Sequence, residues 1–124
     1  MRELVQWCQA HEIAVIGYGS LGGSKNKTGL EQRTSDAVAE VASAHHVSTA
    51  QVLLRYVLQL GVAVIPGATS REHIADNLAV RRASFTLSSE EMRHIESGEK
   101  PARFRNWKGL CADGNAHPGM RCID

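Results

Sequence analysis

The chain has 124 residues, 43% hydrophobic and 22% charged, with a formal net charge of +1 at pH 7. This length allows one domain with a modest core, and the small charge argues against a nucleic-acid partner or an anionic membrane surface. No apolar run approaches the roughly 20 residues of a membrane helix, and charges interrupt the first apolar stretch, so neither a membrane span nor a signal peptide is expected. Three cysteines are an odd number, which favours a reducing compartment, and we expect a cytoplasmic protein.

The first part of the chain predicts a helix, a strand, a loop and a second helix. Residues 2–11 place Leu4, Val5 and Cys8 on one helical face. The stretch IAVIG at 13–17 is short, β-branched and apolar throughout, which is typical of a strand buried on both faces. Residues 18–31 are rich in glycine and polar side chains and predict a loop. Helical spacing resumes at Ser35 and ends near His46.

The middle of the chain predicts a capped helix followed by a second strand. The sequence STAQ at 48–51 matches a capping box, in which a hydroxyl and a glutamine satisfy each other's backbone amides. The apolar pattern that follows ends at Gly61, a residue suited to the left-handed end of a helix. The stretch VAVIP at 62–66 is again apolar throughout and predicts a second strand buried on both faces.

The last part predicts two more helices and an irregular tail. TSRE at 69–72 and SSEE at 88–91 both match capping boxes, and they predict helices that run to about residues 80 and 97. Residues 101–124 show no periodicity and are expected to be irregular or disordered. Cys111, His117 and Cys122 in this tail match no standard zinc spacing, so no metal site is expected.

The two apolar strands are separated by helices, which implies parallel neighbours joined by a crossover. Two strands alone do not form a stable parallel sheet with both faces covered. No internal repeat is present that would let stacking supply the missing neighbours. The sequence therefore predicts an α/β fold that is a piece of a larger domain.

The glycines at 17–22 spell G-x-G-x-x-G after an apolar run, as in a doubly wound dinucleotide fold. That fold also needs a helix at the third glycine and an acidic residue about 20 positions on, at the tip of a strand. Neither is present, because a polar loop follows Gly22 and the acids Asp36 and Glu40 fall within a helical pattern. A barrel is the alternative, since barrel sites lie at the carboxyl ends of strands.

Three segments resemble the aldo-keto reductases. CQAHEIAVIGYGSLG at 8–22 is similar to the family's seventh-strand region. The segment 48–80 is similar to its next helix, eighth strand and cofactor-binding helix, and FTLSSEEMRHIES at 85–97 to the helix that follows. The resemblance implies a partial (β/α)8 TIM barrel with the C-terminal βα units only, formed by residues 1–100. It also implies an oxidoreductase that moves hydride between NADP(H) and a carbonyl.

The resemblance assigns the first strand exit to the cofactor. Tyr18 matches the family's aromatic residue that stacks on the nicotinamide ring, a task suited to a flat face. Gly19, Ser20 and Leu21 match the loop that passes over the pyrophosphate, where backbone amides can approach phosphate. The alternative for Tyr18 is an aromatic ring packed within its loop, and the glycines at 17–22, taken without the resemblance, indicate only a tight strand exit.

The second strand exit and its helix complete the implied site. Gly67, Ala68 and Thr69 follow the strand, although many members have Lys-Ser in place of the first two. The arginine that usually holds the 2′-phosphate aligns with His73, and Arg71 is a candidate substitute. Asp76 and Asn77 match an acid–amide pair that contacts adenine. The implied cofactor is NADP, with NAD left open.

The family's catalytic aspartate, tyrosine, lysine and histidine have no counterpart in this chain, so no catalytic residue is assigned. His45 and His46 fall at a helix end and are expected at the surface, His11 falls at another helix end, and Tyr56 is expected in the core. The chain is therefore expected either to be a fragment that supplies the cofactor half-site of a reductase and is inactive alone, or to be a non-catalytic nucleotide-binding or protein-interaction module. Its expected partners are a nicotinamide dinucleotide and either the missing part of the barrel or a second copy of the chain. Because the edges of both apolar strands would stay unpaired, the isolated chain is expected to be molten or oligomeric. The carbonyl substrate is not determined.

Overall fold

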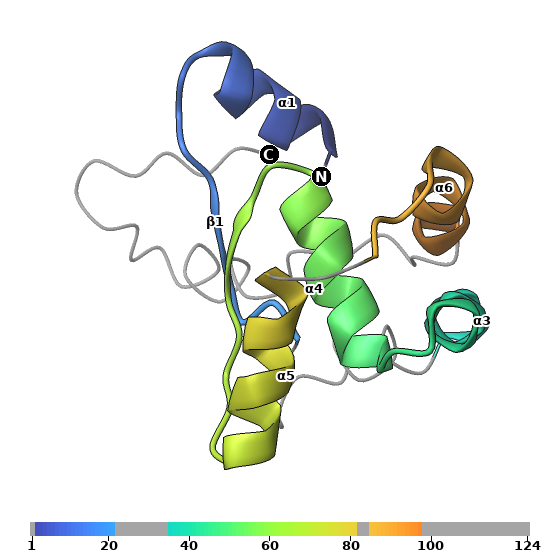
Figure 1. The fold of residues 1–124 in the computed structure, drawn as a ribbon. Coiled ribbons are helices and arrows are strands. Elements are labelled where there is room, and N and C mark those ends of the chain that lie inside the picture. The colour runs from blue at the N-terminus through green and yellow to red at the C-terminus, as the bar shows by residue number, and fades with distance from the viewer. Residues whose placement is uncertain (1, 22–34, 82–84, 98–124) are drawn as a thin grey trace, which may run out of the picture.

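The computed structural model describes residues 2–21, 35–81 and 85–97 (Figure 1). Residues 22–31 of the predicted loop and the tail 101–124, with its three candidate zinc ligands, lie outside the described residues. None of the described helices is long and apolar enough to cross a membrane.

The described elements follow the predicted order of helices and strands along the chain. They are α1 (Arg2–Ala10), β1 (Ile16–Tyr18), α3 (Asp36–His45), α4 (Thr49–Gln59), β2 (Ala63–Ile65), α5 (Arg71–Arg81) and α6 (Ser89–Ser97). The two strands pair in parallel, with Ile16 opposite Ala63 and Tyr18 opposite Ile65. The predicted parallel pairing is thus confirmed.

Helix α4 has the predicted ends. The Ser48 hydroxyl accepts from the backbone N–H of Gln51, and the Gln51 side chain accepts in return from the backbone N–H of Ser48. At the other end Gly61 has φ +77°, a left-handed conformation that favours glycine. The Gln9 side chain of α1 lies where a β-carbon on Gly61 would be, and its amide donates to the Leu60 carbonyl at 2.8 Å.

The predicted capping box at 69–72 is wrong by one residue. Helix α5 begins at Arg71, and the Ser70 hydroxyl, not that of Thr69, accepts from the backbone N–H of His73 at 3.1 Å. The Ser70 carbonyl also accepts the first helical bond, from Ile74. Because the third helical position is then a histidine, no carboxylate from Glu72 closes the box.

The main hydrophobic core lies between α3, α4 and α6. In Figure 1, α4 stands between the strands on one side and α3 and α6 on the other. The buried cluster consists of Val38, Val41, Ala42, Val52, Leu53, Tyr56, Leu87, Met92 and Ile95. The expectation that Tyr56 belongs to the core is confirmed, because its side chain is part of this cluster.

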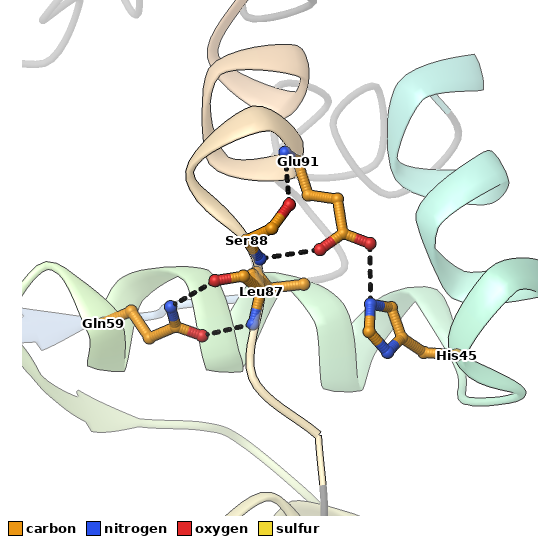
Figure 2. A network of polar contacts seen from close by, with 5 residues as sticks. All are labelled: His45, Gln59, Leu87, Ser88 and Glu91. Carbon is orange, nitrogen blue, oxygen red and sulfur yellow. Dashed lines mark hydrogen bonds and ion pairs between the residues drawn. The ribbon is translucent and has the colours of Figure 1, made fainter.

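The segment leading into α6 is held by polar contacts with two other helices (Figure 2). The Gln59 side chain donates to the Leu87 carbonyl at 2.9 Å and accepts from the Leu87 N–H at 2.7 Å. The capping box of α6 forms as predicted between Ser88 and Glu91. His45 is half-buried rather than at the surface, because Glu91 binds its ring at 2.7 Å and the Phe85 ring lies against it. His46 is exposed, as expected, and His11 is exposed as well.

The strands are not buried on both faces, contrary to the prediction. Ile16, Tyr18 and Ile65 lie on one face of the sheet and are 62%, 91% and 51% exposed. The opposite face is half-buried, and α4 packs against β2. The reason is that a pair of strands has one helical layer beside it here, whereas burial of both faces needs further neighbours.

Helix α1 is also less buried than its apolar face predicts. Val5 is its only buried residue, Cys8 is half-buried and Leu4 is exposed. The helix is joined to α6 by an ion pair between Arg2 and Glu96 at 3.3 Å. Like the strands, α1 therefore presents apolar side chains that no described element covers.

Candidate functional site

The two predicted strand exits lie side by side. Tyr18 pairs with Ile65 at the last position of each strand. Because the strands are parallel, Gly19 and Pro66 both follow the carboxyl ends of their strands, at the same end of the sheet. Pairing therefore brings together two segments that are far apart in the sequence and that were both predicted to contact a dinucleotide.

Tyr18 ends β1 with its ring almost fully open to solvent. It shares its sheet face with Ile16 and Ile65, so one side of its surroundings is apolar. An exposed aromatic ring beside aliphatic side chains offers a flat surface on which another ring can stack.

The loop after β1 has a different role at each position. Gly19 has φ +63° and is exposed, and no atom of the described residues lies within 4 Å of the place a β-carbon would take. The Ser20 hydroxyl donates to the Gly17 carbonyl at 2.7 Å and closes the turn. Leu21 is half-buried and packs against the main core. Of these three predicted contacts, the structure leaves Gly19 the most open.

The loop after β2 is likewise open. Gly67 and Thr69 are exposed, and within the part of the chain that the structure describes no atom lies within 4 Å of a β-carbon built on Gly67. Ala68 is half-buried, and Ser70 is engaged as the cap of α5. The two neighbouring loops thus each contain a glycine, Gly19 and Gly67, that no side chain of residues 2–21, 35–81 or 85–97 covers.

Helix α5 carries the remaining predicted residues. Arg71, His73 and Asp76 are exposed, and Asn77 is half-buried. Since residues three and four apart share a helix face, His73 lies on the same face as Asp76 and Asn77. Arg71, two positions before His73, points to another face, so the two candidate cations do not form a single cluster.

Some contacts beside this site were not predicted from the sequence. The Gln51 side chain donates to the Asp76 carbonyl at 3.3 Å and so joins α4 to α5. The capping-box pattern identified Gln51 but gave no sign of its second partner. Among residues 2–21, 35–81 and 85–97, no group of three or more histidines, cysteines or acids is placed to hold a metal ion.

The model of the aldo/keto reductase family matches residues 1–100. The chain belongs to the aldo/keto reductase family. Among relatives of the family, it is 33% identical over 117 residues to the NADPH-dependent aldose reductase of Saccharomyces cerevisiae, covering 86% of this chain and 36% of the yeast protein. It is also 33% identical over 116 residues to the NAD(P)H-dependent D-xylose reductase of Kluyveromyces lactis, covering 86% of this chain and 35% of that protein.

Solved aldo-keto reductase structures agree with the described fold. The aldose reductase from Schistosoma japonicum superposes with a TM-score of 0.70 at 32% identity, over 82% of this chain and 31% of that one. A Gox0644 variant in complex with NADPH superposes with a TM-score of 0.68 at 27% identity, over 82% of this chain and 34% of that one. The chain spans about a third of the length of the relatives it matches.

Proposed function

We propose that this chain forms the dinucleotide-binding part of an NADP-dependent aldo-keto reductase. In this proposal residues 1–100 correspond to the last two βα units of the (β/α)8 barrel, and residues 101–124 form a separate tail. The observation that carries the proposal is the pairing of Tyr18 with Ile65, which sets two open, glycine-containing strand exits side by side.

The residues present fit a dinucleotide. The uncovered ring of Tyr18 suits stacking against nicotinamide, and the open backbones at Gly19 and Gly67 allow a pyrophosphate to approach without meeting a side chain. Ser20 and Leu21 shape the first loop, and Ala68 and Thr69 shape the second. Bound NADPH would supply the hydride for reduction of an aldehyde or ketone.

The adenosine half of the cofactor is assigned to α5. Asp76 and Asn77 would contact adenine, and Arg71 or a protonated His73 would bind the 2′-phosphate. The 2′-phosphate contact favours NADP. NAD stays open, in keeping with the similarity to the NAD(P)H-dependent D-xylose reductase of Kluyveromyces lactis.

The alternative is a non-catalytic module that binds a nucleotide or another protein. One observation favours a protein partner, namely the apolar sheet face formed by Ile16, Tyr18 and Ile65.

Under either proposal the isolated chain is expected not to reduce ketones, because it contains no counterpart of the family's four catalytic residues. Cofactor-dependent turnover by chain freed of host reductases would contradict this.

Titration of NADPH into the purified chain, followed by nicotinamide fluorescence, tests the proposal. We expect saturable binding that Tyr18→Ala weakens by about five- to tenfold, since aromatic stacking contributes about 1–1.5 kcal/mol. Trp7→Ala is the matched control, because Trp7 is an exposed aromatic residue on α1, away from the strand exits. No binding by the wild-type chain, or equal loss in both variants, would contradict the proposal.

Comparison of NADPH with NADH tests the assignment of the 2′-phosphate. We expect Arg71→Ala or His73→Ala to weaken the binding of NADPH by about three- to tenfold and to leave the binding of NADH unchanged. The reason is that the charge-assisted contact involves only the 2′-phosphate, which NADH lacks. Arg93→Ala, which removes an exposed arginine of α6, is the control. If the wild-type chain binds the two cofactors equally at low salt, neither residue has the assigned role.

A further inference from the structure

Gln51 uses both ends of its side-chain amide. The carbonyl oxygen accepts from the Ser48 N–H at 3.0 Å and completes the capping box of α4. The amide nitrogen donates to the Asp76 carbonyl in the middle of α5 at 3.3 Å. One side chain therefore starts α4 and also joins it to α5.

Apart from packing against α4, helix α5 has few contacts that hold its middle among the described residues. Val80 is its only buried residue and lies near the C-terminal end, while positions 71–76 are all exposed. The Ser70 cap secures the first turn but does not connect α5 to another helix. The Gln51 contact is thus placed between the two ends, at the residue next to Asn77.

We infer that Gln51 is a positioning residue for the dinucleotide site. By holding the Asp76 carbonyl it sets the rotation of α5, and so the direction in which the Asp76 and Asn77 side chains face. This inference rests on the proposed function, because it assigns a purpose to the contact only if α5 binds the adenosine half of the cofactor.

The substitution Gln51→Glu separates the two roles of the side chain. A glutamate at this position still accepts from the Ser48 N–H, as in the usual capping box, but it has no N–H to donate to Asp76. Ser48→Ala is the reciprocal control, because it removes the capping hydroxyl and leaves the Gln51 amide in place.

The first measurement compares NADPH with reduced nicotinamide mononucleotide, which lacks the adenosine half. We expect Gln51→Glu to weaken the binding of NADPH by about two- to tenfold, which is the effect of one hydrogen bond, and to leave the binding of the mononucleotide unchanged. A general loss of structure would weaken both ligands, so equal losses would overturn the inference. Ser48→Ala is expected to leave the ratio of the two affinities as in the wild type.

The second measurement is amide hydrogen exchange of the full chain without nucleotide. Gln51→Glu is expected to speed exchange in α5 by a similar factor and to leave the first turn of α4 protected, whereas Ser48→Ala is expected to do the reverse. Unchanged exchange in α5 of Gln51→Glu would overturn the inference. If the wild-type chain binds no NADPH, the proposed function fails and the assigned purpose of Gln51 fails with it, while exchange still decides whether Gln51 anchors α5.

Discussion

At the scale of single residues, Glu91 uses both of its carboxylate oxygens. One accepts from the Ser88 backbone N–H and the other from the His45 ring, each at 2.7 Å (Figure 2). The Ser88 backbone N–H holds the pKa of Glu91 below its usual value of 4.5, with smaller contributions in the same direction from His45 and the Ser88 hydroxyl, whereas burial acts in the opposite direction. The ionised form of Glu91 is therefore favoured in the folded chain.

This lowered pKa predicts the direction of an acid effect. A carboxyl whose pKa is lower in the folded chain stabilises it above the unfolded value and loses that contribution as pH falls through the folded value. We expect Glu91→Gln to be less stable than the wild type at pH 7, with a difference that shrinks as pH falls below about 4.5. Urea unfolding followed by circular dichroism measures this, with Glu90→Gln, the exposed neighbour, as the control. A difference that is constant across this pH range would contradict the prediction.

At the scale of elements, α6 docks on α3 through buried apolar side chains and through two polar contacts, the half-buried Glu91–His45 pair and the more exposed His94–Glu40 pair. Ile95 is 2% exposed and belongs to the core shared by α3, α4 and α6. His94 binds Glu40 of α3 at 2.8 Å, but the two side chains are 49% and 69% exposed. Burial of apolar surface should therefore contribute more than the ion pair, because exposed pairs are weak.

Two substitutions on neighbouring residues of α6 test this ranking. Ile95→Ala is expected to lower the free energy of unfolding by about 2–5 kcal/mol, since it leaves a cavity in a packed core. His94→Ala is expected to lower it by less than about 1 kcal/mol. Both are measured by urea unfolding at one pH, and a larger effect for His94→Ala would show that charge rather than packing holds α6.

At the scale of the whole molecule, the described sheet has one covered face and one bare face. The bare face presents Ile16, Tyr18 and Ile65, and β1 and β2 are each paired along one edge within the described residues. Apolar strands with open edges favour association with other chains. The bare face is thus the feature that most opposes a stable, isolated monomer.

Of the two expected states of the isolated chain, oligomeric and molten, we expect the oligomeric one, because the core between α3, α4 and α6 is packed while the sheet face is bare. Ile65→Lys places a charge on the bare face and is expected to shift sedimentation toward the monomer. Leu78→Lys, which changes an exposed apolar residue of α5, is the matched control. A wild-type monomer with a sharp cooperative melt and dispersed side-chain NMR signals would contradict the expectation.

The amino-acid sequence by itself was sufficient for the local features. The helices, the boxes at Ser48 and Ser88, and the left-handed Gly61 were predictable because their hydrogen bonds and backbone angles involve residues within a few positions of one another. At the start of α5, however, both Thr69 and Ser70 carry a hydroxyl that can cap the helix, and the structure shows that Ser70 is the cap.

Only the tertiary structure decided what depends on distant parts of the chain. Three features join segments that are 25 or more residues apart: the pairing of Tyr18 with Ile65, the contact of Gln51 with Asp76, and the contact of His45 with Glu91, which half-buries the histidine. A local sequence pattern contains no signal for such contacts. The burial of the strands also depended on the tertiary structure. An apolar run predicts a strand that is buried on both faces, but neighbouring elements decide whether both faces are covered.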